Sequence, residues 1–309
     1  MLRVMERRNF PVASLKLLAS PRSAGKAMDF RGESFRVEPL TMDSFAGIDI
    51  ALFSAGGGIS RDYAKAAVDS GAVVVDNSSA FRMLPDVPLV VPEINGADVK
   101  NHRGIIANPN CTTAITLMAL YPLHREFGVK RIFASTYQAV SGAGARAIQE
   151  LRDQTEAVAK GKPVVKEIFP HQIAFNVIPQ VDSFLDTGYT KEEMKMENEG
   201  RRIMHLPGFK ASVTCVRVPV YRAHSVAVSA EFEREVSPSA AVDILKKAPG
   251  LQYVEDGYPM PLDCADNDDC FAGRVRRDCA MDNGLAFWVC GDQLLKGAAL
   301  NAVQIAELL

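Results

Sequence analysis

An alternation of apolar runs with one helical segment constrains this chain more than any other feature of its sequence. The runs IDIALFSA (48–55) and AVVVDNS (72–78) are short and end in small or polar residues. Between them, RDYAKAAVDSG (61–71) has helical spacing and stops at a glycine. Strand, turn, helix, strand in this order predicts a parallel sheet covered by helices. Ligands of such sheets bind beyond the carboxyl ends of the strands, so we expect a cofactor there.

Similar runs extend this pattern over the first third of the chain. SLKLLAS (14–20), LVVPEIN (89–95) and GIIANPN (104–110) are read as further strands. From about residue 129 the apolar runs become longer and more alternating, which indicates an antiparallel or mixed sheet. The fold class we predict is α/β. A Rossmann-like dinucleotide-binding domain precedes an α+β catalytic and dimerisation domain with a mixed sheet.

Three segments in the second half have the marks of helices. TKEEMKMENEGRRIMHL (190–206) is charged and amphipathic, and SPSAAVDILKKAPG (237–250) has a serine at its start and a glycine at its end. The tail GDQLLKGAALNAVQIAELL is read as a final helix. We expect residues 1–110 and 291–309 to form the dinucleotide-binding domain, and residues 111–290 to form the catalytic and dimerisation domain.

Composition excludes several classes of function. The chain has 309 residues, 35 basic and 37 acidic side chains and a net charge of -2, so no overall field favours nucleic acid or a membrane surface. No apolar run approaches the roughly 20 residues that span a bilayer. Six cysteines in a chain of this length are read as reduced thiols. We therefore expect a soluble cytoplasmic enzyme.

The stretch NPNCTTAITLMALYPL (108–123) places a cysteine where a turn meets a helix. The unpaired amides and the positive dipole end of a helix N-terminus would stabilise a Cys111 thiolate and lower its pKa. The same amides could donate to an oxyanion. Free cysteines are usually buried and inert, and the local sequence leaves both a nucleophile and a core thiol open.

A thiolate enzyme also needs a proton acceptor and a substrate anchor. His224 lies in RVPVYRAHS, and Arg217 lies seven residues before it. Taken singly, each is explained by a structural role, as a strand-end histidine and an ion-pair arginine. Together they would place an acid–base group and a carboxylate-binding fork in one region.

Five motifs, spread along the chain with matching spacings, carry a resemblance to a known family. NPNCTT, STYQAVSGAG, RVPVYRAHS, FRMLPDVPLVVPEIN and the closing GDQLLKGAA together resemble aspartate-β-semialdehyde dehydrogenase, from about residue 4 to residue 306. The resemblance implies NADPH-dependent reductive dephosphorylation of L-aspartyl-4-phosphate to L-aspartate 4-semialdehyde, in lysine, threonine and methionine biosynthesis. It also implies a homodimer or homotetramer. Another acyl-phosphate reductase, of the N-acetylglutamyl-phosphate or glyceraldehyde-phosphate type, is the alternative within the same chemistry.

The resemblance assigns roles to the catalytic residues. Cys111 would attack the acyl phosphate and form a thioester, which divides one difficult displacement into two easier ones. Asn110 would help fix the acyl oxygen, and Gln138 would position the acyl group. His224 would act as acid and base on the thiol and on the thiohemiacetal, and Arg217 would hold the substrate α-carboxylate.

Three further residues would bind the rest of the substrate. Glu199 would pair with the α-ammonium group, and Arg82 would bind phosphate together with Arg202. The family usually has lysine at the position of Arg202, and the two cations are not equivalent, so phosphate affinity is expected to differ. From the residues alone, Glu199 and Arg202 are explained as a solvated pair on an exposed helix.

The resemblance also names cofactor positions. Arg22 and Ser23 resemble the pair that reads the 2′-phosphate of NADP, and Asn77 follows the next predicted strand. A small-residue turn would pass close to the cofactor, and a second group would approach the nicotinamide from the catalytic domain. The turn is Ser54, Ala55, Gly56 and Gly57, and the second group is Ser141, Gly142, Ala143 and Gln293.

The beginning of the sequence departs from the family pattern. The family opens with a strand and a glycine-rich turn of the GATGAVG type, whose backbone binds the cofactor phosphates. MLRVMERRNFPV matches the family only from partway along the helix that follows. We expect Met1 to be an internal methionine and NADP binding and stability to be reduced. A non-catalytic subunit without cofactor, assembled with longer copies, is the alternative from a different class.

One cysteine-rich segment raises the possibility of a metal site. DCADNDDCFAGRVRRDC brings Cys264, Cys270 and Cys279 near several aspartates. The spacings are not those of a zinc module, and no histidine is close in sequence. We interpret this segment as a surface loop and expect no metal.

Overall fold

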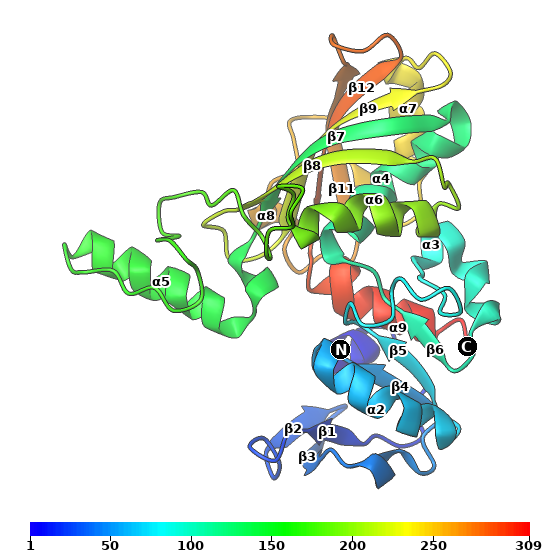
Figure 1. Cartoon of the computed structure of the whole chain (residues 1–309), viewed down its shortest axis with the longest axis vertical. Coiled ribbons are helices and arrows are strands. Elements are labelled where there is room, and N and C mark those ends of the chain that lie inside the picture. The colour runs from blue at the N-terminus through cyan, green and yellow to red at the C-terminus, as the bar shows by residue number, and fades with distance from the viewer. The chain divides into compact units, whose positions relative to one another are not determined.

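The computed structural model describes residues 1–309 and divides them into two compact units (Figure 1). Unit 1 comprises Met1–Pro109 and Ala298–Leu309, and unit 2 comprises Asn110–Gly297. No helix in the chain is long and apolar enough to cross a membrane.

A parallel sheet in unit 1 has the alternation that the sequence predicts. Its order is β4 (Ile50–Phe53), β5 (Val73–Asp76), β6 (Ile105–Ala107), and all neighbours run parallel. The helix α2 (Gly57–Asp69) connects β4 to β5 and packs against β5. Because the strands are parallel, their carboxyl ends meet at one edge, where a ligand of such a sheet binds. The predicted α/β class is confirmed.

A second three-stranded sheet in unit 1 was only partly foreseen. It has the order β1 (Leu17–Ala19), β3 (Glu33–Pro39), β2 (Ala27–Phe30), and only β1 coincides with an expected strand. The hairpin from β2 to β3 turns at Arg31 and Gly32, which both have positive φ angles, of 51° and 80°. Such a turn joins antiparallel strands tightly.

Short helices complete the core of unit 1. They are α1 (Leu2–Arg7), α3 (Pro92–Asn95) and α9 (Leu300–Ala306), with the 3-10 turns Met42–Phe45 and Gly96–Asn101. The expectation of a strand over 89–95 is wrong. Only Leu89 forms a bridge, to Ala107, and Pro92 occupies the first turn of α3 instead. A proline has no N–H to donate to a sheet ladder, and its fixed φ suits a helix start.

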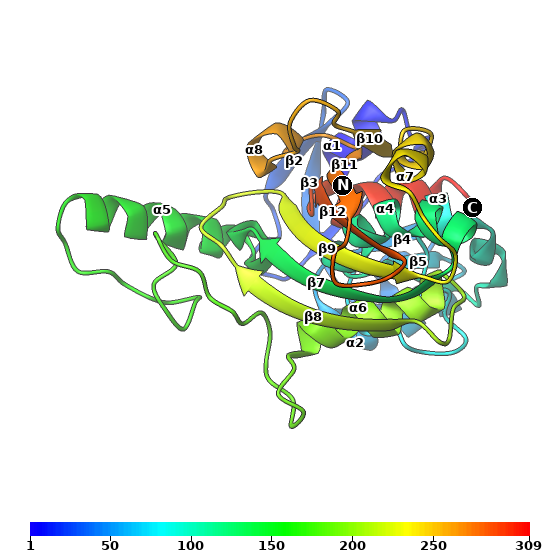
Figure 2. The same cartoon turned by 90° about the horizontal axis from the view of Figure 1, so that it is seen from above.

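Unit 2 is built on one mixed sheet of six strands, which Figure 2 shows from above. The inner pairs β7–β9, β9–β12 and β12–β11 are antiparallel, while the outer pairs β7–β8 and β10–β11 are parallel. This confirms the expected mixed sheet. In spatial order the strands are β10 (Leu251–Tyr253), β11 (Cys270–Arg277), β12 (Gly284–Gly291), β9 (His224–Phe232), β7 (Val129–Gln138) and β8 (Lys210–Arg217).

Helices cover one face of this sheet. The 17-residue helix α4 (Cys111–Phe127) contacts β7, β9, β11 and β12, and α6 (Lys191–Ile203) packs beside it on β8. The shorter α7 (Pro238–Leu245) packs on β10 and β11. The predicted helices thus exist. The helix α7 begins at the expected cap, where the side chain of Ser237 accepts a backbone N–H group, and Thr190 caps α6 in the same way.

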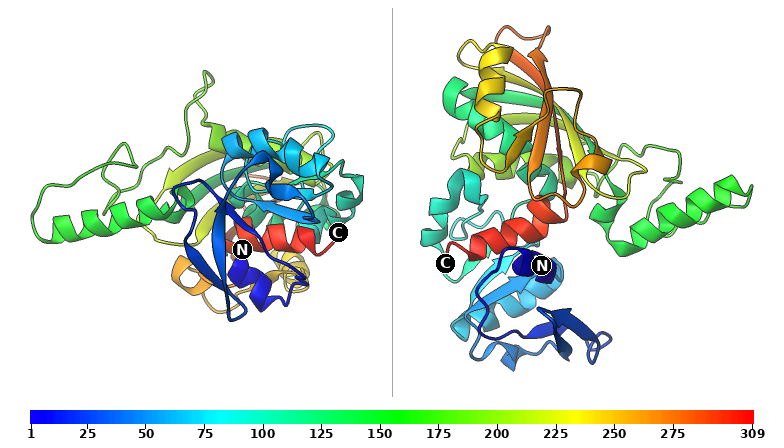
Figure 3. Two further views of the ribbon diagram at one scale, coloured as in Figure 1. Left: turned by 90° about the horizontal axis from the view of Figure 1, so that it is seen from below. Right: turned by 180° about the vertical axis from the view of Figure 1, so that it is seen from behind.

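Two features of unit 2 differ from the sequence-based expectations. The helix α5 (Ala145–Ala159) was not predicted, and it extends with the chain that follows it beyond the edge of the sheet (Figures 1 and 3). The segment around Cys264 is a surface loop only in part: a turn follows Cys264, and Cys279 is exposed. It forms α8 (Pro261–Cys264) and β11, and both Cys264 and Cys270 are fully buried. The cysteines between its aspartates are buried in the core of unit 2, whereas the high local density of charged residues suggested an exposed loop.

Candidate active site

The first turn of α4 holds the candidate nucleophile as the sequence predicts. Asn110 is the N-cap of α4, and its side-chain oxygen accepts from the backbone N–H groups of Thr112 (3.0 Å) and Thr113 (3.1 Å). Asparagine is among the best N-cap residues because it satisfies these orphan donors. Cys111 is therefore the first helical residue, and it is partly exposed.

A glycine lets the chain pass close to the nucleophile. A Cβ built on Gly297 would lie 3.1 Å from Cα of Cys111 and 2.6 Å from its Cβ, and the second distance is shorter than real Cβ contacts. Gly297 lies in the π-helical turn Leu295–Ala299, within the GDQLLKGAA motif. Only a residue without a side chain permits this packing, so steric contact with Cys111 explains the glycine of this motif.

Three further candidate residues meet at one edge of the six-stranded sheet. Gln138 ends β7 and pairs in register with Arg217, which ends the parallel strand β8. Beside them, His224 begins the antiparallel strand β9, where Tyr137 pairs with Ser225. Because parallel strands end together and an antiparallel neighbour begins there, residues far apart in sequence reach the same place.

Arg217 is held by the backbone and is nearly buried. Its Nη1 donates to the carbonyl of Ala139 at 2.7 Å, and the Phe169 ring centroid lies 6.0 Å from its guanidinium carbon. Burial lowers the pKa of Arg217, while the negative charges of Cys111 and Glu192 oppose that change. Arginine stays charged at neutral pH in any case, so this side chain is a buried cation beside the cysteine.

His224 is fully buried, and one of its ring nitrogens is already engaged. Nδ1 accepts the backbone N–H of Ala139 at 3.0 Å, whereas Nε2 has no hydrogen-bond partner. Burial, together with the positive charge of Arg217, lowers the pKa of His224 to about 3. The ring is therefore neutral, and since Nδ1 is an acceptor, the proton is on Nε2.

Gly142 lies against both of these side chains. A Cβ on Gly142 would be 2.9 Å from Nη1 of Arg217 and 3.2 Å from Nε2 of His224. The 3-10 turn Val140–Ala143 thus brings the backbone to the two functional groups. Ser141 and Gln293 are close by: Nε2 of Gln293 donates to the Ser141 hydroxyl, and its Oε1 accepts the N–H of Ala223 at 2.8 Å.

The helix α6 brings two of its three buried carboxylates to this site. Oε2 of Glu199 accepts the backbone N–H of Asn110 at 2.6 Å, and Glu199 is only 2% exposed. The interpretation of Glu199 and Arg202 as a solvated pair on an exposed helix is therefore wrong for Glu199, and Arg202 is itself half-buried. The second carboxylate is Glu192, which the sequence reasoning missed because it read residues 190–206 only as a charged amphipathic helix.

Residues expected to bind cofactor and phosphate lie in unit 1. Ser54, Ala55, Gly56 and Gly57 form the turn from β4 to α2, and Gly56 has a φ of +91°, which favours glycine. Asn77 follows β5, and its Oδ1 is buried without a hydrogen-bond partner. Small residues, helix amides and an unused amide oxygen at the strand ends fit a dinucleotide.

Two arginines of unit 1 have contrasting environments. Arg82 is buried, and its guanidinium donates to the carbonyls of Asn108 (2.8 Å) and Asn77 (2.9 Å), at the ends of β6 and β5. Arg22, with Ser23, lies in the exposed turn after β1, where a ligand can reach it.

A cavity of about 450 Å³ lined by Tyr258 and its neighbours contains none of the expected site residues.

The fold and the site define a class of protein. A parallel α/β unit with a small-residue turn is combined with a mixed-sheet unit that holds a helix-terminal cysteine, a neutral histidine and a buried arginine. These are the parts of a dinucleotide-dependent oxidoreductase that works through a thiol.

Comparison with known proteins identifies the family. Residues 1–102 match the model "Semialdehyde dehydrogenase, NAD binding domain", and residues 120–296 match "Semialdehyde dehydrogenase, dimerisation domain". The chain belongs to the aspartate-semialdehyde dehydrogenase family.

Similar proteins cover the whole chain. The aspartate-semialdehyde dehydrogenase of Aquifex aeolicus is 53% identical over all of this chain and 93% of its own length, and that of Bacillus subtilis is 48% identical with the same coverage. The crystal structure of aspartate semialdehyde dehydrogenase II from Vibrio cholerae has a TM-score of 0.98 and 45% identity, and covers 100% of this chain and 93% of that one. The resemblance inferred from five motifs is confirmed.

Proposed function

We propose that this chain reduces L-aspartyl-4-phosphate to L-aspartate 4-semialdehyde with NADPH and releases phosphate, as a step towards lysine, threonine and methionine. The observation that carries the proposal is the placement of Cys111 at the start of α4, with Gln138, Arg217 and His224 at one sheet edge of the same unit. A related structure from Vibrio cholerae, 44% identical, is described as complexed with ASA. The free thiols support a reducing compartment, the cytoplasm.

In this proposal residues 1–110 and 291–309 bind the nucleotide, and residues 111–290 carry out catalysis and dimerisation. NADPH supplies the hydride when it is bound. Arg22 and Ser23 read its 2′-phosphate, because an arginine would lack a partner beside NAD. The turn and Asn77 hold the rest of the dinucleotide, and Ser141, Gly142, Ala143 and Gln293 approach the nicotinamide. In unit 1 the support is the small-residue turn and the unpartnered Asn77 oxygen.

Cys111 performs the covalent step. Its thiolate attacks the acyl carbon, a C–S bond forms, and the C–O bond to phosphate breaks with its electron pair leaving on phosphate. The N-terminus of α4 stabilises the thiolate, since the positive end of the helix dipole favours an anion. Asn110 and Gln138 fix the acyl group. After reduction, the C=O bond re-forms while the C–S bond breaks with its electron pair on sulfur, which releases the aldehyde and restores the Cys111 thiolate.

The charged residues hold the substrate. Arg217 binds the α-carboxylate, because its guanidinium is buried and fixed by the Ala139 carbonyl. Glu199 pairs with the α-ammonium group, and its burial makes that pairing stronger than at a surface. Arg82 and Arg202 bind the phosphate as two cations.

The tautomer of His224 shapes its role in this mechanism. Nδ1 accepts from Ala139, so the group that faces away from the backbone is Nε2–H, a donor. We assign to this N–H the stabilisation of negative charge on the thiohemiacetal oxygen, the acid side of the expected acid–base role. A neutral imidazole can polarise a carbonyl in this way. Acting as base on the thiol would require the other tautomer, which the Ala139 N–H opposes.

A homodimer is the assembly that unit 2 supports. One face of β7 is buried under helices, while Phe133 (48% exposed) and Tyr137 (38% exposed) lie on the opposite face. Phe175 and Val177, in the segment after α5, are 72% and 58% exposed. Exposed apolar side chains on the open face of a sheet are typical of an interaction site, and residues 120–296 match a dimerisation domain, so a second copy of this chain is the occupant we propose.

The test is the intact mass of the protein after mixing with aspartyl phosphate, beside a Cys111→Ser control. Acylation consumes no NADPH, so it examines the cysteine apart from the nucleotide site. We expect an aspartyl adduct that is absent from the serine variant. Absence of the adduct on folded protein would overturn the assignment and favour a non-catalytic subunit.

A further inference from the structure

The buried carboxylate of Glu192 connects two residues of the proposed active site. Glu192 lies in the first turn of α6 and is 8% exposed. A single oxygen, Oε1, accepts from Nδ2 of Asn110 at 3.0 Å and from Nε2 of Gln138 at 3.1 Å. Asn110 lies at the start of α4, and Gln138 lies at the end of β7. Glu192 was assigned no substrate group above. It therefore connects the element that carries the nucleophile to the sheet edge.

The carboxylate determines which way both amides point. An ionised carboxylate only accepts hydrogen bonds, so each amide must turn its NH₂ group towards Glu192. Oδ1 of Asn110 then faces the N–H groups of α4 and caps the helix. Oε1 of Gln138 accepts the hydroxyl of Thr136 at 2.9 Å. Reversal of either amide would place oxygen against oxygen, which the buried site disfavours.

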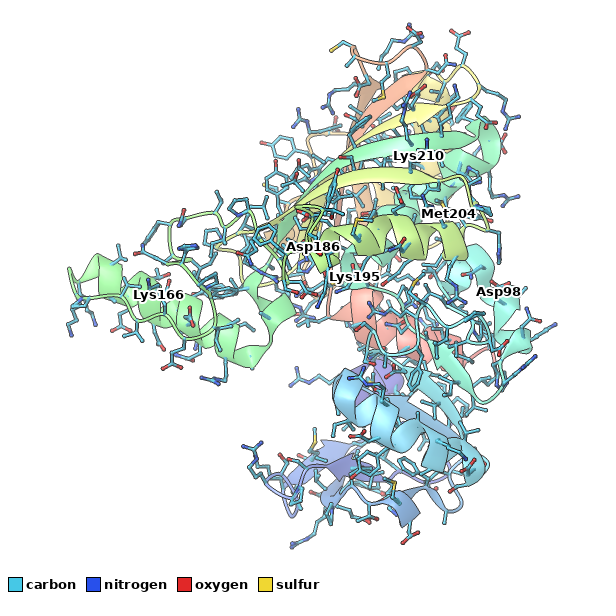
Figure 4. All side chains as sticks on the ribbon, viewed as in Figure 1. Asp98, Lys166, Asp186, Lys195, Met204 and Lys210 are labelled. Atoms are coloured by element: carbon cyan, nitrogen blue, oxygen red, sulfur yellow. The ribbon has the colours of Figure 1, made fainter.

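Lys195 keeps the carboxylate ionised in this interior. Its Nζ lies 2.8 Å from Oε2 of Glu192, one turn along α6, and 3.3 Å from a carboxylate oxygen of Asp182 (Figure 4 labels Lys195). Burial raises the pKa of Glu192, but the charge and hydrogen bond of Lys195 and the two amides outweigh burial and lower the pKa overall. The acceptor that orients the amides is therefore available at neutral pH.

We propose that Glu192 is a positioning residue for acyl transfer to Cys111, and that it acts by fixing the amides of Asn110 and Gln138. The second N–H of each amide is then directed to the acyl oxygen, while Glu192 itself stays off the substrate. This inference rests on the proposed thioester chemistry. Loss of the shared acceptor would let both amides rotate, and misplacement of about 1 Å at such a site reduces the rate about 100-fold.

The test compares single-turnover acylation of Cys111 by aspartyl phosphate in matched variants. Glu192→Leu removes the acceptor, and we expect acylation to slow about 100-fold while the alkylation rate of Cys111 by iodoacetamide stays unchanged. The reason is that positioning affects the acyl group and not the thiol. The matched control is Glu193→Gln. Glu193 is equally buried on the same helix, but it accepts from the backbone of Thr190 and Cys215, so its loss should reduce stability without slowing acylation.

A second pair of variants keeps the proposal testable if the leucine variant fails to fold. Glu192→Gln retains an oxygen for both amides but turns an NH₂ group towards Lys195, so donor meets donor and acylation should slow. Adding Lys195→Met removes that conflict, and we expect the double variant to recover most of the rate. Wild-type acylation rates in the leucine or glutamine variant would overturn the positioning role. An absent adduct in the wild-type protein would instead overturn the thioester chemistry, so the two failures are distinguishable.

Discussion

Replacing His224 with asparagine removes the imidazole but keeps an acceptor for the N–H of Ala139, because Oδ1 of asparagine occupies nearly the place of Nδ1. In the folded protein the pKa of His224 is lowered to about 3 by burial and by the Arg217 cation. In the unfolded chain it returns to the ordinary value of about 6.5. Between these values the unfolded state binds more protons than the folded state, so low pH favours unfolding.

The magnitude follows from these two values. At pH 7.5 both states hold a neutral ring, and the free energy of unfolding is unaffected. At pH 5 the unfolded histidine is protonated and the folded one is not, which lowers the free energy of unfolding by about 2 kcal/mol. The loss of stability is absent well above pH 6.5, grows as the pH falls below 6.5, and stops growing near pH 3, where the folded histidine is protonated too. The asparagine variant has no such group, so its stability should fall by about 2 kcal/mol less between pH 7.5 and pH 5.

The single tryptophan of the chain provides the assay. Trp288 lies in β12, where it pairs with Ala227 of β9, the strand that begins at His224. Urea unfolding followed by its fluorescence therefore reports on the unit that contains the histidine. Groups such as His124, whose pKa is also lowered by burial, are present in both proteins and cancel in the comparison. Equal losses of stability in the two proteins would refute the neutral, buried histidine.

Three further substitutions examine other parts of the structure. Gly297→Ala places a methyl group 2.6 Å from Cβ of Cys111. We expect the free energy of unfolding in urea to fall by about 1–3 kcal/mol and acylation of Cys111 to slow. An unchanged acylation rate would contradict the close packing. Arg217→Lys keeps the charge but loses the fork, so kcat/KM for aspartate semialdehyde should fall roughly 10- to 100-fold in steady-state assays; a wild-type value would exclude the bidentate contact. Phe133→Asp should shift the protein towards monomer in sedimentation experiments, while Met28→Asp, equally exposed in unit 1, should not; a dimeric Phe133 variant would move the interface elsewhere.

Much of the local secondary structure could be predicted from the sequence, because interactions between neighbours along the chain determine it. The short apolar runs and the helical spacing of RDYAKAAVDSG depend only on neighbours along the chain, and they correctly predicted the parallel sheet and α2. The same is true of Asn110: its capping preference is a local property, so the position of Cys111 at the start of α4 could be predicted. Local pattern failed at Pro92, where strand-like residues surround a helix-starting proline.

The tertiary structure decided what those residues can do. The exposure and partners of Glu192, 82 residues from Asn110 along the chain, depend on the packing of α6 beside α4, which no local pattern encodes. The tautomer of His224 likewise depends on a backbone N–H that lies 85 residues away. Burial sets the pKa of His224, and burial is a property of the assembled unit. The sequence by itself determined most of the elements, the family and the place of Cys111 at a helix start, whereas only long-range packing determined charge states, amide orientations and the contact between Gly297 and Cys111.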